Sequence, residues 1–374
     1  MKKAIIILTL VLISGLAISW VVNAVSVNRI NQNFISQNNW EVYETPVFDG
    51  INRAYYPTIL KVNKTYRMWY TDEKEGLYSV GYTTSKDGLT WGEPTMVNGL
   101  TGQPNHAVVV NIGKESQPYY RIWYADASVW PYVINLFRTA ESEDGINWTN
   151  DEIMHSDPPF FTHTWPSDCF YGSYGPGAVL YNPKGYAKIN DNDPMGNKYV
   201  MYYNVYTWCQ GTTEGTALAY SADGINWKRY GTMPVIMAEG DNNPSAWDAG
   251  YLYAWTVLKL KNSYQMWYSG GILDSNDGIG YAYSEDGINW IKDTENPVLH
   301  VDDADAQIWR KDRTFTPLVL KEGNSYKMWF SARDGETVGS NSYVIGYATL
   351  SISPLTKANI FNNCLFNNCL GKKN

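Results

Sequence analysis

The segment Tyr264–Tyr268 reads Tyr-Gln-Met-Trp-Tyr, and the segment Tyr281–Trp290 that follows it reads Tyr-Ala-Tyr-Ser-Glu-Asp-Gly-Ile-Asn-Trp. Aromatic and β-branched residues in alternation are typical of β-strands. The Asp-Gly pair indicates a tight turn, because glycine supplies the positive φ that such turns need without a steric penalty. The two segments therefore predict consecutive antiparallel strands of one small sheet.

The same unit returns along the chain at a spacing of roughly 50–80 residues, which is typical of an array of supersecondary units. The aromatic strands are Tyr66–Tyr70, Tyr120–Tyr124, Tyr199–Tyr203, Tyr264–Tyr268 and Tyr326–Phe330. The first four are followed by the Asp-Gly turns Ser85–Trp91, Ser142–Trp148, Ser221–Trp227 and Ser284–Trp290. The fifth is followed by Gly346–Ala348 and then by no Asp-Gly turn.

Each predicted strand carries bulky side chains on both faces, since Tyr264, Met266 and Tyr268 alternate with Trp267. A sheet with packing on both faces suits a blade pressed between two neighbouring blades. The next strand of every copy holds a small residue at one equivalent position, where we expect blades to approach closely. These residues are Thr83, Ala140, Ala219, Ala282 and Ala348. The sequence thus predicts an all-β fold, a five-bladed β-propeller.

The missing outer strand of the fifth blade is predicted at the other end of the chain. Trp40 and Pro46 have nearly the spacing of Trp290 and Pro297 in the fourth copy. An N-terminal strand that completes the last blade would close the ring and protect sheet edges that are otherwise exposed.

The ends of the chain differ from the repeats. Residues 1–24 combine a positive start with an apolar run and are predicted to be a signal peptide cleaved after Ala24, with an uncleaved membrane anchor as the alternative. Both predict a secreted or extracytoplasmic domain. Residues 25–38 are expected to be a linker, residues 39–351 the propeller, and residues 352–374 a low-complexity tail.

Composition excludes some partners and leaves others open. The formal net charge of −8 argues against nucleic acid and against an anionic membrane surface. None of the four cysteines has a zinc-binding spacing with histidine, so no metal or cofactor is predicted. Cys169 and Cys209 could pair in an exported protein, but their spacing in the sequence does not establish a disulfide.

The repeated strands and turns resemble the five-bladed propellers of the arabinanase, levansucrase and invertase superfamily of glycoside hydrolases, over roughly 310 of 374 residues. The resemblance implies a site at the central channel, where some relatives also hold a cation such as Ca²⁺. It also implies an Asp before a Pro on blade one, an Asp on blade two, and a Glu before Gly-Pro on blade three. This chain has Tyr56, the pair Asn105-His106, and Tyr174 at those places.

Other acidic residues near the starts of the predicted inner strands are candidates for catalysis, because glycoside hydrolysis uses two carboxyl groups that flank the scissile bond. The candidate catalytic residues are Asp248, Asp168 and Asp312, whereas Glu214 and Glu239 are expected to be solvated in loops. Aromatic rings can stack on a sugar face, and cationic or imidazole groups can bind its hydroxyls. The candidate substrate-binding residues are Arg53, Tyr55, His106, Trp165, Tyr174, Trp247 and Arg313.

Three functions remain open at this point. The first is a glycoside hydrolase-like propeller that acts on a neutral glycan, and the second is a non-catalytic propeller that binds a glycan or a protein at the cell surface. The third is a surface scaffold that uses the rims of the blades. Two carboxyl groups about 5–10 Å apart at one channel mouth would favour catalysis. A mouth with aromatic rings and no such pair would favour binding.

Overall fold

A computed structural model describes residues 40–129, 136–157, 160, 170–208, 214–240, 243–272, 275–334 and 343–352. The predicted signal peptide, linker and most of the tail lie outside these residues, as do Cys169 and Cys209. Residues 40–320 and 327–349 belong to one compact unit, described below. The described part of a second unit is residues 321–326 and 350–352, within which the Ile352 N–H donates to the Asn324 carbonyl at 2.7 Å. Among the described residues, no helix is long and apolar enough to cross a membrane.

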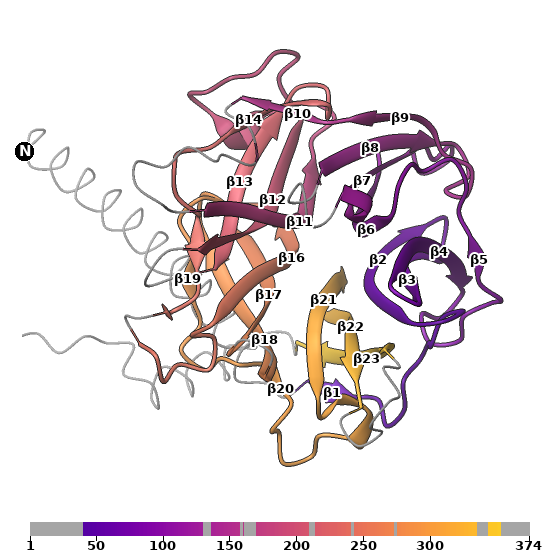
Figure 1. Cartoon of the computed structure of the whole chain (residues 1–374), viewed down its shortest axis with the longest axis vertical. Coiled ribbons are helices and arrows are strands. Elements are labelled where there is room, and N and C mark those ends of the chain that lie inside the picture. Colours follow the sequence, from indigo (N-terminus) through magenta and orange to yellow (C-terminus); the bar gives the residue numbers. More distant parts are fainter. Residues whose placement is uncertain are drawn as a thin grey trace, which may run out of the picture. The chain divides into compact units, whose positions relative to one another are not determined.

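The described strands form five sheets arranged as the blades of a β-propeller, as predicted (Figure 1). Blade one holds β2 (Ala54–Val62), β3 (Thr65–Lys74), β4 (Leu77–Ser85) and β5 (Thr95–Met96). Blade two holds β6 (Pro104–Asn111), β7 (Tyr120–Asp126), β8 (Leu136–Ser142) and β9 (Thr149–Ile153). Blade three holds β11 (Phe170–Tyr181), β12 (Tyr199–Trp208), β13 (Gly215–Ser221) and β14 (Asn226–Arg229), with β10 (His155–Asp157) and β15 (Ile236–Met237) added.

Blade four holds β16 (Tyr251–Lys259), β17 (Tyr264–Ile272), β18 (Ser275–Ser284), β19 (Ile291–Lys292) and β20 (Leu299–His300). Blade five holds β21 (Arg313–Glu322), β22 (Ser325–Arg333), β23 (Tyr343–Ser351) and β1 (Glu41–Val42). Short 3₁₀ helices η1 (Ala127–Val129), η2 (Pro194–Gly196) and η4 (Ile308–Arg310) lie in connections. The first strands of the blades, β2, β6, β11, β16 and β21, surround the centre of the ring in Figure 1.

The ring closes as the sequence predicts, because the N-terminal strand β1 is the outer strand of the last blade. It pairs antiparallel with β23, with Val42 opposite Ala348. The Val47 N–H then donates to the Ile345 carbonyl at 2.9 Å and continues the contact. The first and last parts of the propeller are therefore joined by backbone hydrogen bonds, which cover the edge of β23.

Each core of the propeller lies between two neighbouring blades. The central tryptophans of the aromatic strands are fully buried there, with 0% exposure for Trp69, Trp123, Trp267 and Trp329. The five small residues expected at close approaches are also buried, at 2% exposure for Thr83 and 0% for the four alanines. Bulky rings and small residues thus interdigitate across blade interfaces, as close packing requires.

A repeated hydrogen bond joins an aromatic strand to the Asp-Gly turn of the next blade. The indole N–H of Trp69 donates to the Gly145 carbonyl at 2.7 Å, and that of Trp123 donates to Gly224 at 2.8 Å. The equivalent residue of blade three is Tyr202, whose hydroxyl donates to the Gly287 carbonyl at 2.6 Å. Trp329 of blade five donates to Gly88 of blade one at 2.8 Å and completes the series across the closure. We call each of these contacts an interblade latch.

The latch explains why glycine occupies the turn. Gly145 has a φ of +82°, and a Cβ there would lie 2.6 Å from Cζ2 of Trp69. Gly88 has a φ of +83°, and its Cβ would lie 2.7 Å from Cζ2 of Trp329. Both the left-handed backbone and the close approach of the indole therefore require a residue without a side chain.

The preceding aspartate holds the turn in shape. Asp144 Oδ1 accepts hydrogen bonds from the N–H groups of Ile146 and Asn147, each at 2.8 Å. Partial burial alone would raise the pKa of this carboxyl, but these donors outweigh it and lower the pKa of Asp144 to about 2. Asp286 has the same arrangement in blade four, and its pKa is also lowered to about 2.

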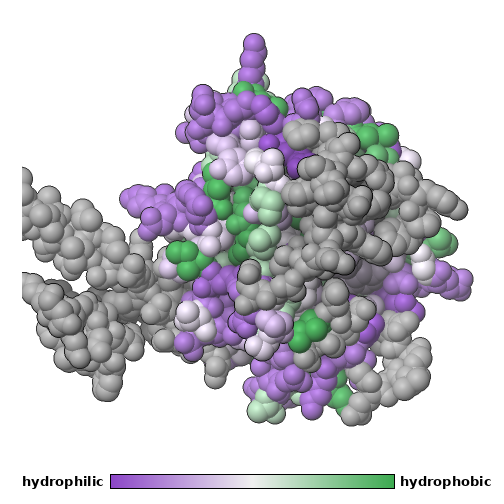
Figure 2. Space-filling view, turned by 60° about the vertical axis from the view of Figure 1, so that its left-hand side comes forward, coloured by the Kyte–Doolittle hydropathy of each residue, from purple (hydrophilic) through white to green (hydrophobic). Residues whose placement is uncertain are grey.

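The surface of the described residues is mixed. Figure 2 shows hydrophilic residues over much of one face, with hydrophobic residues in small separate groups among them. Individual exposed side chains such as Leu77 at 61% and Ile291 at 55% are normal on the surface of a folded domain and carry no functional argument.

Candidate functional site

The inner strands begin with an irregular backbone that turns side chains toward the channel. The pairing of β2 with β3 shifts register between Tyr55 and Thr58, and that of β6 with β7 shifts between Asn105 and Val108. Within these bulges Tyr56 has a φ of 53° and His106 a φ of 51°. Positive φ is rare for bulky residues, and bulges of this kind are over-represented beside active sites.

Neighbouring blades hold this backbone in place. The Tyr56 N–H donates to Ser331 Oγ of blade five at 2.9 Å, and the Thr316 N–H donates to Ser269 Oγ of blade four at 2.6 Å. Thr316 itself has a φ of 49°. Side-chain hydroxyls of one blade thus support the strained start of the next inner strand.

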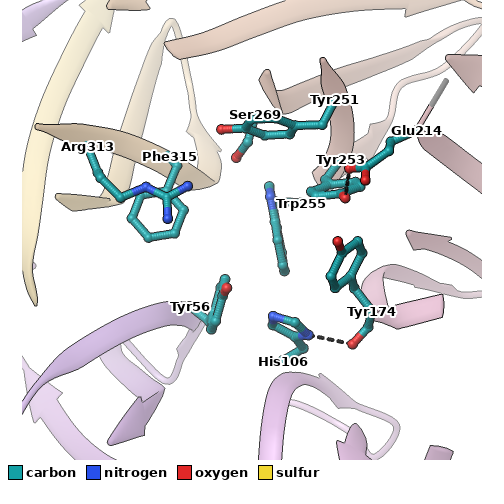
Figure 3. Close-up of a pocket in the computed structure, with 10 residues that line it drawn as sticks. All are labelled: Tyr56, His106, Tyr174, Glu214, Tyr251, Tyr253, Trp255, Ser269, Arg313 and Phe315. Carbon is teal, nitrogen blue, oxygen red and sulfur yellow. Dashed lines mark hydrogen bonds between the residues drawn. The ribbon is translucent and has the colours of Figure 1, made fainter. Parts of the chain in front are cut away.

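The starts of the five inner strands surround a cavity of about 200 Å³ (Figure 3). The described residues that line it are Tyr56, His106, Tyr174, Glu214, Tyr251, Tyr253, Trp255, Ser269, Arg313 and Phe315. We call this cavity the channel pocket. Every blade contributes to it, so it forms only when the ring is complete.

Six of the described lining residues are aromatic, and their rings touch one another. Tyr56 stacks on Trp255, with centroids 5.0 Å apart and planes 26° apart. Tyr174 and Tyr253 have centroids 5.1 Å apart, and so do Tyr253 and Tyr251. In Figure 3 Trp255 stands at the middle of the group, between Arg313 on one side and Glu214 on the other. The pocket therefore presents ring surface around a few polar groups, as small-molecule sites commonly do.

Two tyrosines of β16 each hold a carboxylate. The Tyr253 hydroxyl donates to Glu214, and the Tyr251 hydroxyl donates to Asp277. Burial, followed by the nearby carboxylate, raises the pKa of each tyrosine well above its usual value, so both hydroxyls keep the proton that they donate. Glu214 lines the pocket, whereas Asp277 is not among the described lining residues and has 1% of its side chain exposed.

Arg313 is already paired within the protein. Its Nε donates to the Asp277 carboxylate, and its guanidinium lies over the Phe315 ring at 4.6 Å from the centroid. Burial alone would lower the pKa of Arg313, but Asp277 outweighs it and raises the pKa. The pair therefore joins a buried carboxylate to a partly exposed guanidinium that also lines the pocket, and their charges offset each other.

His106 is neutral in this site. Burial lowers its pKa to about 4, and a hydrogen bond to the Tyr174 carbonyl opposes this only partly. Nδ1 lies 2.6 Å from that carbonyl oxygen, which can only accept, so Nδ1 carries the proton. In the neutral ring Nε2 is then the acceptor, and His106 can accept a hydrogen bond from a hydroxyl.

Two of the three predicted catalytic carboxylates, Asp248 and Asp312, have other partners in the structure. Asp248 is buried, and its Oδ2 accepts from Lys292 Nζ at 2.8 Å and from the Tyr268 hydroxyl at 3.4 Å. Burial raises its pKa although Lys292 opposes the shift. Asp312 pairs with Arg333, and Asp168 lies outside the described residues. Neither Asp248 nor Asp312 is among the described residues that line the channel pocket.

Six of the seven predicted binding residues are described, and they divide into two sets. His106, Tyr174 and Arg313 meet in the channel pocket. Arg53 and Tyr55 instead bond Glu73, at 2.9 and 3.1 Å, and Trp247 stacks on Tyr268 with centroids 5.8 Å apart. Trp165 lies outside the described residues.

Sequence reasoning missed the carboxylate of the pocket. The loop position of Glu214 predicts a solvated side chain, but the residue is partly buried and bonded to Tyr253, which lies 39 residues away in the next blade. Tyr56, Tyr251, Tyr253 and Trp255 do stand out in the sequence as aromatic residues beyond the repeated strands. Nothing in the sequence around Glu214 pairs it with them.

The described residues contain no group of three or more His, Cys, Asp or Glu side chains that could hold a metal ion.

Comparison with known proteins gives the fold a context. No known protein-family profile matches the chain. The uncharacterized proteins MT1551 and Rv1502 of Mycobacterium tuberculosis (strains CDC 1551 / Oshkosh and ATCC 25618 / H37Rv) are each 29% identical over 123 residues, which is 31% of this chain and 37% of theirs. The chain thus spans little more than a third of the curated relatives it matches.

Solved structures match over most of the chain. The BT0996 RGII complex has a TM-score of 0.59 at 14% identity, and the match covers 88% of this protein and 97% of that one. A second match belongs to the GH130 family of mannoside phosphorylases, which is described as containing glycoside hydrolases that target beta-1,2 mannosidic linkages in Candida mannan. It has a TM-score of 0.55 at 14% identity, and the match covers 85% of this protein and 96% of that one. The beta-1,2-mannobiose phosphorylase from Listeria innocua, in complex with beta-1,2-mannobiose, has a TM-score of 0.54 at 13% identity, covering 88% and 100%. The protein therefore has the five-bladed propeller fold of glycoside hydrolases and phosphorylases, and the likeness does not distinguish the arabinanase and invertase superfamily from GH130.

Proposed function

We propose that this protein is an exported carbohydrate-active propeller that binds one sugar unit of a glycan in the channel pocket. The observation that carries the proposal is the pocket itself, where the inner strands of all five blades bring together aromatic rings and a few polar groups. The likeness in fold to glycoside hydrolases and phosphorylases supports it. Export rests on the apolar N-terminal segment and the Ala24 cleavage pattern.

The lining matches the two surfaces of a sugar ring. The stacked pair of Tyr56 and Trp255 offers a flat apolar surface to the C–H face. The polar edge of the sugar would meet Glu214, Ser269 and neutral His106. Glu214 and His106 Nε2 can accept hydrogen bonds from its hydroxyls, and the Ser269 hydroxyl can donate one. A volume of about 200 Å³ is below the range of roughly 300–1,000 Å³ for drug-sized ligands, so it suits a single small ring.

Hydrolysis is the second candidate, and Glu214 is the observation that favours it. Among the described residues it is the one carboxylate that lines the pocket, so it would be the acid or base in a hydrolytic step. The second carboxyl group would have to come from outside the described lining, and Asp168 is the predicted candidate. Binding comes first in our proposal because one described carboxylate satisfies recognition but not a two-carboxylate mechanism.

One experiment tests both candidates. The full-length protein is incubated with a panel of oligosaccharides, and binding heat and released sugars are measured on the same samples. Saturable binding that Trp255→Ala weakens supports the pocket, and released product that Glu214→Gln abolishes adds catalysis. Absence of binding across neutral, acidic and amino-sugar glycans would contradict the proposal. Fractionation of cells that express the full-length protein tests export separately.

A further inference from the structure

We propose that the sugar bound in the channel pocket carries an ammonium group, as a free amino sugar does, and that this group lies against Glu214 within the aromatic lining. This inference rests on the proposed carbohydrate function and specifies its ligand class. The sequence favours a neutral glycan, whereas the charges and rings of the pocket favour a cation.

The first step is the charge that the described lining presents to a ligand. The positive charge of Arg313 is directed to Asp277, to which its Nε donates. His106 contributes no charge at neutral pH, because its Nδ1 proton is committed to the Tyr174 carbonyl and burial keeps the ring neutral. Glu214 is the acidic residue of the described lining, and the Tyr253 hydroxyl that donates to it is a neutral group. Of the two charged side chains in the described lining, Arg313 is thus paired with Asp277, whereas the donor from Tyr253 to Glu214 is a neutral hydroxyl, so the lining favours a cation over an anion.

The second step is the ring surface that lines the pocket together with that carboxylate. Tyr253 donates to Glu214, and the Tyr174 and Tyr251 rings each lie 5.1 Å from the Tyr253 ring, measured between centroids. Aromatic faces attract cations through their quadrupoles, and cages of such rings are a known means of binding organic ammonium groups. A carboxylate that lines the same pocket as these rings adds a charge-assisted hydrogen bond that is stronger with an ammonium than with a hydroxyl.

The third step is what the pocket disfavours. A phosphate or an acidic sugar would lie near the Glu214 carboxylate and would have to compete with Asp277 for Arg313, which also lies over Phe315. Like charges at short distance in a partly buried site repel strongly. A neutral sugar meets no such repulsion, but its hydroxyls gain less from the carboxylate than an ammonium does.

The ligand test compares triplets that share one ring. Glucosamine, galactosamine and mannosamine are each titrated beside their N-acetyl form and their parent hexose, and choline serves as an ammonium without a sugar. We expect at least one free amine to bind about tenfold or more tightly than both neutral members of its triplet. Equal binding within every triplet, or preference for a neutral member, overturns the inference but leaves the carbohydrate proposal intact. Binding of choline alone retains the ammonium pocket and contradicts the carbohydrate proposal.

A matched pair of variants assigns the effect to Glu214. Glu214→Gln removes one negative charge within the pocket, and Glu285→Gln removes one from an exposed turn of blade four. We expect Glu214→Gln to lose about tenfold or more in affinity for the free amine and a clearly smaller factor for the parent hexose, whose hydroxyls gain less from the carboxylate, and Glu285→Gln to bind like the unaltered protein. Equal losses for amine and hexose would overturn the inference.

A measurement on the unaltered protein avoids any folding defect of the variant. Affinity for the free amine should fall as salt rises, whereas affinity for the parent hexose should change little. The same salt dependence for both ligands would contradict a contact between ammonium and carboxylate.

Discussion

The Asp-Gly turns at the blade interfaces and the mouth of the central channel are built in opposite ways. Each turn repeats the same residues and the same latch, in which an aromatic side chain of one blade donates to the glycine carbonyl of the next. The channel pocket takes a different residue from each inner strand, such as Tyr56, His106 and Tyr174. Repetition thus serves assembly of the ring, while recognition depends on the positions at which the repeats differ.

The difference separates stability from binding. A latch residue is fully buried between two blades, so its loss removes packing and a hydrogen bond together. A pocket residue faces a cavity that already exists, so its truncation creates less new void. Changes in the latches should therefore lower stability most, and changes in the pocket should lower affinity most.

The largest effect is expected for Trp123→Ala. Trp123 has 0% exposure and donates to Gly224 at 2.8 Å, so the variant should lose about 3–5 kcal/mol in the free energy of unfolding. Chemical denaturation measures this loss. The control is Trp290→Ala, a half-buried tryptophan of a repeated turn, which should lose clearly less. Equal losses for the two variants would contradict a special role of the latch.

Two glycine variants isolate the interblade contact. Gly145 and Gly76 have nearly the same backbone, with φ values of +82° and +80°. A Cβ added at Gly145 would lie 2.6 Å from the Trp69 indole, whereas a Cβ added at Gly76 would meet no atom within 4 Å. Gly76→Ala should cost about 1–2 kcal/mol from the left-handed backbone alone. Gly145→Ala should cost about 1–3 kcal/mol more, because the indole must move. Matching melting curves for the two variants would show that the latch tolerates a side chain.

Trp255→Ala should show the reverse pattern to Trp123→Ala. Trp255 is only partly buried and stacks on Tyr56 in the pocket, so its truncation should weaken glycan binding by about 2 kcal/mol, or roughly thirtyfold. Its cost in unfolding free energy should be smaller than that of Trp123→Ala. Calorimetric titration and denaturation on the same protein measure both. Unchanged affinity with a large loss of stability would place Trp255 with the structural tryptophans.

Stability should also depend on pH, in a different pH window for each of the two regions. The pKa of His106 is lowered from 6.5 to about 4 in the folded protein. Between these two pH values the unfolded chain holds a proton on His106 that the folded protein does not, so stability should fall as pH drops from about 6.5 to 4. The pKa values of Asp144 and Asp286 are lowered from 3.8 to about 2, so their contribution is lost as pH drops from about 4 to 2. Denaturation midpoints across pH measure both windows. His106→Gln should flatten the upper window and leave the lower one unchanged, and a slope retained between about pH 6.5 and 4 would contradict this assignment.

The part of the site that can be predicted from sequence is the part that lies on the repeats. The first strand of each blade precedes the aromatic strand, and this order places His106, Tyr174 and Arg313 at the strand starts. Asp248 also stands before an inner strand, but the structure buries it in an ion pair with Lys292, whose position depends on β19 of the same blade. Distance along the sequence from an inner strand does not decide which way a loop carboxylate turns.

Sequence by itself determined the number of blades, the turns and the closure of the ring. The repeat period, the Asp-Gly pairs and the N-terminal outer strand can each be recognised from residue types and their spacing. The backbone hydrogen bonds and buried rings of the propeller agree with all three patterns. Tertiary structure alone decided the chemistry of the channel. It brought Glu214 to Tyr253 and Asp277 to Arg313, because these pairs join different blades or segments far apart in the chain. The charge of the pocket follows from those pairings, and no spacing in the sequence encodes them.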